Sequence, residues 1–403
     1  MKAVICQEGC LRVADVPDLR PGAGQILINV VRAGICGSDV HMRDHMNDIS
    51  SVVAATGQSG FAENNAGFIL GHEFSGEILE YGPNTNRRWK PGTLMVAMPL
   101  CRHGRHPYLI GSSPHAPGSY AERMIVQEAL TFPVPNGLPA EHATLTEPMS
   151  VAWHAVQRSR IQRRETAYVI GCGPVGLAAI ALLKAAGVST VIASDLSLRR
   201  RELAAVCGAD VVVDPRIAAP FKAAPLPSRT TTVGGILQLP ITPWSAPGAP
   251  DELNLSIDAM ERLRRFSMVP WWQLFKAMHK WDKGPSGPIV FECSGAKGMI
   301  DRLVEEAPPM SRIVVVGSCL EPDTIRPVLA QMKEIDVIFS VGYNPAEFRA
   351  VLHMIAEGKV NPVPFLTGTV GFAGVDAAFD ALNNPEKHAK ILIDPQGSIS
   401  SIS

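Results

Sequence analysis

Three segments that lie far apart in the chain carry side chains able to bind a metal ion. The first places a thiol, a hydroxyl, a carboxylate and an imidazole within six residues, at Cys36, Ser38, Asp39 and His41. The second sets His72 and Glu73 in a turn framed by glycines, and the third sets Glu147 before a proline that starts a helix. Ligation by thiolate, imidazole and carboxylate, with one position left open, is typical of a catalytic zinc. The three segments together therefore indicate a catalytic rather than a structural zinc site.

A glycine-rich turn predicts a site for a dinucleotide. The run Gly171-Cys-Gly-Pro-Val-Gly176 follows a strand-like segment, 168–170, and opens a helix at Pro174. Gly171 permits the tight turn, Gly173 lets a pyrophosphate approach the backbone, and Gly176 lets the helix pack closely on the strand. The free N–H groups at the positive end of the helix then face the phosphates.

The residues after the next strand bear on which dinucleotide is bound. Asp195 follows the run 190–194, and a carboxylate there accepts hydrogen bonds from both adenosine ribose hydroxyls and repels a 2′-phosphate. Arg199, Arg200 and Arg201 come next, and an arginine can hold the 2′-phosphate of NADP, although these three also fit the solvated start of a helix. We predict NAD, with NADP as the alternative.

The elements that position these residues fall into two kinds. Up to about residue 135, short strands at 26–31, 76–81 and 120–126 alternate with Gly/Pro turns, which predicts an all-β, partly open barrel. Beyond residue 152, helices at 174–186 and 198–207 separate β-branched runs, which predicts a doubly wound parallel sheet. The β-branched runs are 168–170, 190–194, 210–213, 288–292 and 312–316, and a last strand is expected at 389–394.

One segment interrupts the strand–helix alternation. Between Pro215 and Pro288 the chain runs for more than seventy residues, where a crossover usually needs far fewer. Its first half is rich in Pro, Ala and Thr, and helices are expected at 251–266 and 271–281. We expect its aromatic cluster, Trp271, Trp272, Phe275 and Trp281, to pack the insertion onto the body, with a substrate or subunit contact as the alternative.

Composition narrows the classes of function. The 403 residues suggest two domains, and 46% hydrophobic against 19% charged residues fits a folded globular protein. A formal net charge of −1 offers no electrostatic footprint for nucleic acid or an anionic membrane. The eight cysteines are scattered without a CxxC pair, and no apolar run suits an export signal or a membrane span, so we expect a cytoplasmic location.

With these motifs in order, the sequence resembles the zinc-dependent medium-chain dehydrogenase/reductases of the alcohol dehydrogenase type, most closely their sorbitol/threonine/2,3-butanediol dehydrogenase branch. The resemblance spans nearly the whole chain. It is carried by Gly34-Ile-Cys-Gly-Ser-Asp-Val-His, Gly71-His-Glu-Phe-Ser-Gly-Glu, Glu147-Pro-Met-Ser-Val-Ala-Trp-His-Ala-Val, Val169-Ile-Gly-Cys-Gly-Pro-Val-Gly-Leu, Ala378-Phe-Asp and Ala389-Lys-Ile-Leu-Ile. It implies a discontinuous GroES-like catalytic domain, 1–152 and 330–403, around a Rossmann domain, 153–329, with an insertion at about 217–285.

The resemblance also implies roles for individual residues. Cys36 and His72 would bind zinc, with either Glu73 or Glu147 as the carboxylate, and Asp39 would fix the tautomer of His72. Ser38 and His41 would relay the proton to solvent through the cofactor ribose. The residues expected to hold the cofactor are Gly171, Gly173, Pro174, Val175, Gly176, Asp195, Arg200 and Gly317. The implied reaction is reversible, NAD(P)-dependent oxidation of a secondary alcohol, vicinal diol or polyol to a ketone, in a homodimer or homotetramer.

The chain departs from many relatives at the second, structural zinc. Where they carry four closely spaced cysteines, this chain has Cys101 alone, so a Cys₄ site is impossible. The nearby His103, His106 and His115 match no known zinc spacing and are interpreted as a polar loop. Two alternatives remain: a zinc-free, NADPH-dependent enone or quinone reductase, and a catalytically silent dinucleotide-binding protein.

Overall fold

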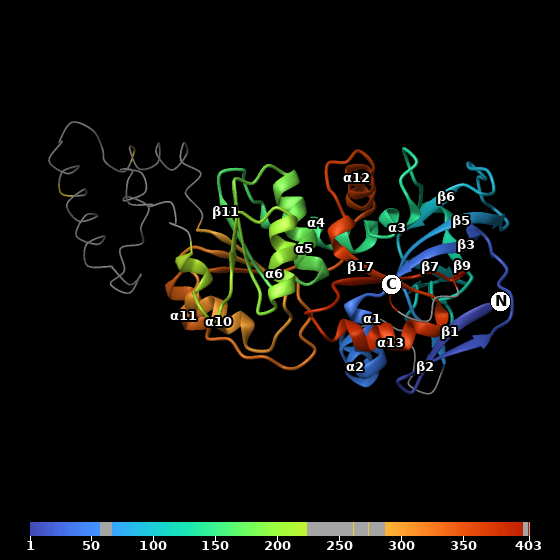
Figure 1. The fold of residues 1–403 in the computed structure, drawn as a ribbon, viewed down its shortest axis with the longest axis horizontal. Helices are drawn as coiled ribbons and strands as arrows, with labels where there is room; N and C mark the ends of the chain where they lie inside the picture. Colours follow the sequence, from blue (N-terminus) through green and yellow to red (C-terminus); the bar gives the residue numbers. More distant parts are fainter. Residues whose placement is uncertain (57–66, 224–260, 262–272, 274–286, 398–401, 403) are drawn as a thin grey trace.

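The computed structural model describes residues 1–56, 67–223 and 287–397, together with 261, 273 and 402. Two sheet systems lie side by side, with the helices α4 (Thr146–Ser159) and α12 (Pro345–Ala356) between them (Figure 1). Apart from residues 261 and 273, the predicted helices at 251–266 and 271–281 lie outside the described residues, and so does the whole aromatic cluster.

The first sheet system is built from both ends of the chain. Its main sheet has the order β10 (Thr131–Pro133), β6 (Leu94–Ala97), β5 (Glu73–Tyr81), β3 (Gln25–Gly34), β18 (Lys390–Ile393) and β17 (Leu366–Val370), and β9 (Arg123–Gln127) also pairs with β3. A smaller sheet joins β2 (Cys10–Asp15), β1 (Lys2–Gln7) and β4 (Phe68–Ile69), and β7 (Leu100–His103) pairs with β8 (His106–Leu109). The predicted β-rich barrel region is confirmed, but it is not all-β, because two helices, at residues 37–44 and 46–55, interrupt its strands.

The C-terminal strand has a direct effect on the site. Leu392 of β18 pairs with Gly34 at the end of β3, two residues before Cys36. Because β18 runs antiparallel to β3, its first residue, Lys390, lies beside the chain that leaves β3 toward Cys36. The C-terminal strand therefore lies beside the Cys36 segment, which belongs to the N-terminal part of the chain.

Helices and short 3₁₀ turns close the barrel region. The helices are α1 (Gly37–Asp44), α2 (Met46–Ala55), α3 (Ala140–Ala143) and α13 (Val375–Leu382). The 3₁₀ turns are Glu128–Leu130, Val363–Phe365 and Phe372–Gly374. An apolar cluster of Val96, Met98, Ala143, Phe348 and Leu352 ties α12 to the barrel.

The second sheet system is fully parallel, as predicted. Its order is β13 (Val211–Val213), β12 (Thr190–Ser194), β11 (Thr166–Ile170), β14 (Ile289–Glu292), β15 (Arg312–Val315) and β16 (Asp336–Phe339). Numbered along the chain this is 3-2-1-4-5-6, the order that places a dinucleotide above the first strand of each half. Buried β-branched and aromatic side chains on both faces of β11 and β14 explain why these runs form central strands.

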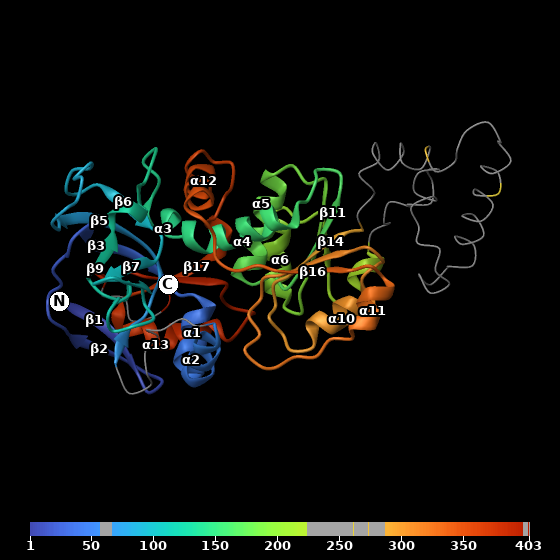
Figure 2. The same cartoon turned by 180° about the vertical axis from the view of Figure 1, so that it is seen from behind.

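The helices of this region cover both faces of the parallel sheet (Figure 2). They are α5 (Pro174–Ala185), α6 (Leu198–Val206), α10 (Met299–Glu306) and α11 (Pro327–Met332), and a 3₁₀ turn spans Pro220–Lys222. The strand β16 lies past residue 330, the predicted end of the Rossmann domain, and pairs with β15 of the parallel sheet. The domain limits stated in the sequence analysis remain a prediction.

None of the helices within the described residues is long and apolar enough to cross a membrane.

Candidate functional site

Cys36 lies where the chain passes from β3 into α1. It is the N-cap residue of that helix, and its N–H donates to Oδ2 of Asp39 at 3.0 Å. Ser38, two residues further on, brings its Oγ to 3.3 Å from Nε2 of His72. The segment that carries Cys36 and the turn that carries His72, which are far apart in the sequence, are therefore next to each other in the structure.

The ring of His72 is held between two polar groups of α1. Its Nε2 is 3.3 Å from Oγ of Ser38, and its Nδ1 is 3.3 Å from Oδ1 of Asp39. The other oxygen of Asp39 accepts a hydrogen bond of 2.6 Å from the hydroxyl of Tyr120. This arrangement turns Nε2 toward Ser38 and Nδ1 toward Asp39.

Charges buried in the site shift the pKa values of His72 and Asp39. Burial alone would lower the pKa of His72, but the Asp39 carboxylate and the Cys36 side chain outweigh burial and hold that pKa well above its usual value. Burial would raise the pKa of Asp39, but His72 and the hydroxyl of Tyr120 hold it below its usual value. Asp39 therefore stays a carboxylate that orients the imidazole.

The two candidate carboxylates have different partners. Both oxygens of Glu73 are paired with Nζ of Lys390, at 2.7 and 2.8 Å, and the same ammonium donates to the carbonyl of Ile35 at 2.9 Å. Glu73 and Lys390 are almost completely buried. The carboxylate of Glu73 is thus already neutralised by a cation from β18.

Glu147 lies at the start of α4 and is less fully engaged. Its Oε1 accepts a hydrogen bond of 2.8 Å from the hydroxyl of Tyr343, and within the described part of the chain its Oε2 has no such partner. Burial, together with the charge of Glu73, raises the pKa of Glu147 to about 7, although His72 and Lys390 oppose the shift. A buried carboxylate with one free oxygen is suited to ligate a cation.

We expect Tyr343→Phe to weaken zinc retention by about tenfold, because losing a hydrogen bond that orients a metal ligand typically lowers metal affinity by about 10–100-fold. Chelator competition followed by metal analysis measures the effect. Tyr81→Phe is the control, because Tyr81 donates its hydroxyl to the carbonyl of Trp89, away from the site. Equal zinc retention in the two variants would show that Tyr343 does not orient Glu147.

The donor types around Cys36 and His72 fit zinc: a thiol, an imidazole nitrogen that faces Ser38, and a buried carboxylate with a free oxygen. As the side chains stand, no group of three or more Cys, His, Asp or Glu residues that could hold a metal ion occurs among the described residues. The same finding covers Cys101 and its neighbouring histidines, where the rings of His103 and His115 lie 4.8 Å apart. The ligand set therefore stays a proposal.

His41 lies three residues after Ser38 on α1 and is half-buried. Residues at this spacing share one helix face. Burial, and then the charge of His45, lower the pKa of His41 below its usual value.

The glycine turn has the close packing that its sequence predicts. Gly171 has a φ of +91°, a conformation that favours glycine. A Cβ on Gly176 would lie 2.0 Å from the carbonyl oxygen of Gly171, whereas a Cβ on Gly173 would meet only Nη1 of Arg200, at 4.0 Å. Gly173 thus leaves open space above the turn, and Pro174 and Val175 begin α5 beside it.

These two glycines give contrasting predictions. We expect Gly176→Ala to lower the free energy of unfolding by at least about 2 kcal/mol, since backbone must move to admit the methyl group. We expect Gly173→Ala to leave that free energy within about 0.5 kcal/mol but to weaken NADH binding about tenfold, since the methyl group fills the space where a pyrophosphate approaches. Urea unfolding and NADH fluorescence titration measure the two effects. Loss of stability in Gly173→Ala with cofactor affinity intact would contradict this division.

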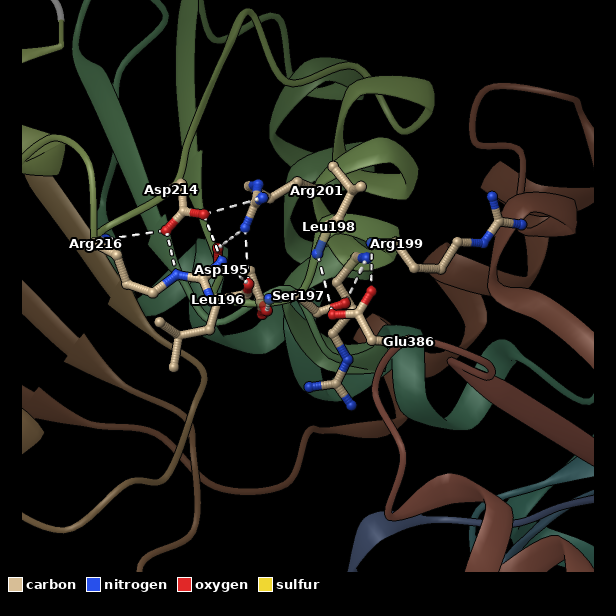
Figure 3. Close-up of polar contacts among 10 residues, drawn as sticks. Asp195, Leu196, Ser197, Leu198, Arg199, Arg201, Asp214, Arg216 and Glu386 are labelled. Atoms are coloured by element: carbon tan, nitrogen blue, oxygen red, sulfur yellow. Dashed lines mark hydrogen bonds and ion pairs between the residues drawn. The ribbon is translucent and has the colours of Figure 1, made fainter.

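Asp195 organises the loop that follows β12. Its Oδ2 accepts from the N–H of Cys172 in the glycine turn at 2.6 Å, and its Oδ1 accepts from the N–H of Ser197 at 2.8 Å. Figure 3 shows this loop and the start of α6. A cavity of about 270 Å³ opens here, and its lining includes Gly171, Asp195, Arg200 and Pro385.

Gly317 lies beyond β15 and is tightly packed. Its N–H donates to the carbonyl of Glu292 at 2.9 Å, and a Cβ there would lie 2.2 Å from the backbone nitrogen of Gly295.

Sequence reasoning missed three residues that contact the site, Tyr120, Lys390 and Tyr343. Each lies far along the chain from its partner: 81 residues separate Tyr120 from Asp39, 317 separate Lys390 from Glu73, and 196 separate Tyr343 from Glu147. Lys390 stands in the C-terminal run Ala389-Lys-Ile-Leu-Ile, which was recognised, but nothing local in that run indicates a partner.

Comparison with known proteins agrees with this architecture. Residues 22–136 match the model of the alcohol dehydrogenase GroES-like domain, and residues 174–225 match that of the zinc-binding dehydrogenases. An (R,R)-butanediol dehydrogenase of Bacillus subtilis is 32% identical over 398 residues, covering 96% of each chain. An enzyme of the same name from Neisseria gonorrhoeae is 26% identical over 403 residues, covering 96% of this chain and 97% of its own. A crystal structure of 2R,3R-butanediol dehydrogenase from Bacillus subtilis shares the fold, with a TM-score of 0.71 at 24% identity, covering 98% of this chain and 99% of that one.

Proposed function

The chain belongs to the zinc-binding alcohol dehydrogenase family with a GroES-like domain, and on this premise we propose that it oxidises a secondary alcohol, in particular a vicinal diol or polyol, to a ketone with NAD. The observation that carries the proposal is the meeting of Cys36, His72 and Ser38 beside the barrel, with Asp39 behind the imidazole. The butanediol dehydrogenases named above support a diol as substrate.

One catalytic zinc would be held by Cys36, His72 and Glu147. Glu147 is chosen over Glu73 because both oxygens of Glu73 are already paired with Lys390. Bound zinc supplies a Lewis acid that lowers the pKa of an alcohol hydroxyl toward neutrality. Asp39 keeps Nε2 of His72 turned toward the site, and Tyr343 orients the carboxylate of Glu147.

The chain's own groups would carry the proton away. The Oγ of Ser38, 3.3 Å from Nε2 of His72, would accept the proton that the substrate hydroxyl releases while the serine's own hydroxyl proton passes on toward His41. His41 passes it to solvent, and its lowered pKa keeps the imidazole neutral and able to accept a proton at neutral pH.

The parallel sheet would bind the dinucleotide. The nicotinamide supplies a hydride acceptor. Gly171, Gly173 and the start of α5 would hold the pyrophosphate, and Asp195 and Arg200 would face the adenosine half in the cavity beside β12. Asp195 favours NAD over NADP because its carboxylate repels a 2′-phosphate.

Two further properties are inferred. All eight cysteines are free thiols, which suits the reducing cytoplasm. The assembly would be a homodimer or homotetramer, as expected from the family resemblance.

A substrate screen tests the proposal. Purified protein is assayed with NAD and with NADP on vicinal diols, polyols and simple secondary alcohols, reading cofactor reduction, and its zinc content is measured. We expect turnover of a diol or polyol with NAD and one zinc per chain. Zinc-free protein that reduces enones or quinones with NADPH would instead favour the reductase, and no turnover with tight cofactor binding would favour a silent binding protein.

A further inference from the structure

The start of α6 is covered by a carboxylate from the other end of the chain. Oε1 of Glu386 accepts from the N–H of Leu198 at 3.2 Å, and its Oε2 accepts from the N–H of Arg199 at 3.2 Å (Figure 3). Ser197, the N-cap residue, also donates its hydroxyl to the carbonyl of Pro385 at 3.1 Å. Residues 385 and 386 lie just before β18, a strand of the barrel sheet. A segment that leads into the barrel sheet therefore contacts the start of α6, after β12, at this point.

The carboxylate of Glu386 occupies the N-terminal end of α6, where the helix would otherwise be able to bind an anion. The first N–H groups of a helix have no partner within the helix and favour negative charge. In α6 those of Leu198 and Arg199 donate to Glu386, and that of Arg200 donates to the hydroxyl of Ser197 at 3.1 Å. These backbone hydrogen bonds, that of Arg199 foremost, lower the pKa of Glu386, so it is charged at neutral pH.

The arginines at the start of α6 differ in how far they are committed. Arg199 pairs with Glu202 at 3.1 Å. Arg201 pairs with Asp214 at 3.1 Å and donates to the carbonyl of Asp195. Arg200 lines the cavity, and its buried Nε has no hydrogen-bond partner among the described residues. The guanidinium of Arg200 is therefore available to a ligand in the cavity. The amides of Leu198 and Arg199 already donate to Glu386, whose negative charge disfavours the binding of another anion there.

We propose that Glu386 is a specificity-determining residue for the cofactor: its carboxylate, seated on the first amides of α6 next to the Asp195 loop, disfavours the 2′-phosphate of NADP. Asp195 and Glu386, which lie on opposite sides of Ser197, then both disfavour the 2′-phosphate. Glu386 belongs to a segment outside the parallel sheet, just before β18. NAD, which has a hydroxyl at this position, is affected little. The inference rests on the proposed binding of a nicotinamide dinucleotide in this cavity.

The test is equilibrium binding of NADH and NADPH, followed by cofactor fluorescence, for wild-type protein and for Glu386→Gln. Glutamine removes the charge but keeps an oxygen that can accept from one amide. We expect Glu386→Gln to tighten NADPH binding about fivefold and to change NADH binding less than about twofold, because one charge at a helix end has an effect of this size. The gain for NADPH is expected to shrink in 1 M salt, where charges are screened beyond about 3 Å.

Glu334→Gln is the matched control. It removes a negative charge from an exposed side chain between α11 and β16 that does not line the cavity, and we expect its NADPH-to-NADH affinity ratio to stay within about twofold of wild type. Glu386→Ala, which also removes the acceptor, is expected to shift the ratio in the same direction as Glu386→Gln. Equal changes for both cofactors, or an unchanged ratio in both Glu386 variants, would overturn the proposal while leaving the proposed function intact. Wild-type protein that binds neither cofactor would overturn both.

Discussion

Replacing Cys36 with alanine is expected to lower kcat/KM for alcohol oxidation by at least about 10³-fold and to leave less than one zinc per chain. The thiol is the one sulfur among the proposed ligands, and Lewis-acid stabilisation by zinc is worth several kcal/mol, with about 1.4 kcal/mol for each factor of ten. Steady-state kinetics and metal analysis of the same preparation measure both effects. His72→Ala is expected to behave in the same way.

Cys10→Ala is the control for this experiment, because Cys10 is an exposed thiol at the start of β2. It should keep its zinc and its activity. A Cys36→Ala protein that stays fully active after chelation would contradict the proposed mechanism.

Lys390→Met is expected to lower the free energy of unfolding by about 3–5 kcal/mol, because it leaves the charge of Glu73 buried without its partner. The ammonium contacts both oxygens of Glu73, and both side chains are almost completely buried. Methionine has nearly the volume of lysine, so the loss of charge dominates over the loss of packing. Urea unfolding of the variant and the wild type gives the difference.

The double variant Glu73→Gln/Lys390→Met is expected to recover much of this loss, because it no longer buries an unpaired charge. Lys184→Met, which breaks the more exposed pair of Lys184 with Asp210, should cost less than about 1 kcal/mol. If Lys390→Met cost no more than Lys184→Met, the buried ion pair would not be what holds Glu73.

The parts of the fold that the sequence predicts are those with a local signal. The run at 190–194 and residues 312–315 of the run at 312–316 form parallel strands, because β-branched side chains are favoured where both faces of a strand are buried. The turn from Gly171 to Gly176 is equally local, since the close approach of Gly176 to the carbonyl of Gly171 admits no side chain. Recognition of the family and of both sheet types followed from such signals and is confirmed.

The parts that could not be predicted depend on pairing between distant segments. The family resemblance left Glu73 and Glu147 unranked, because the branch that the sequence resembles uses either carboxylate. Their difference arises from Lys390 and Tyr343, which reach them only after β18 pairs with β3 and α12 packs near α4. The contact of Glu386 with the first turn of α6 is of the same kind, because Glu386 lies 188 positions along the chain from Leu198.

X-ray absorption at the zinc edge tests the central claim most directly. For wild-type protein with one zinc bound per chain, we predict a first shell with a single sulfur atom and with nitrogen or oxygen for the rest, and we predict loss of the sulfur contribution in Cys36→Ser. A first shell without sulfur in the wild type, or a sulfur contribution that persists in Cys36→Ser, would contradict the account.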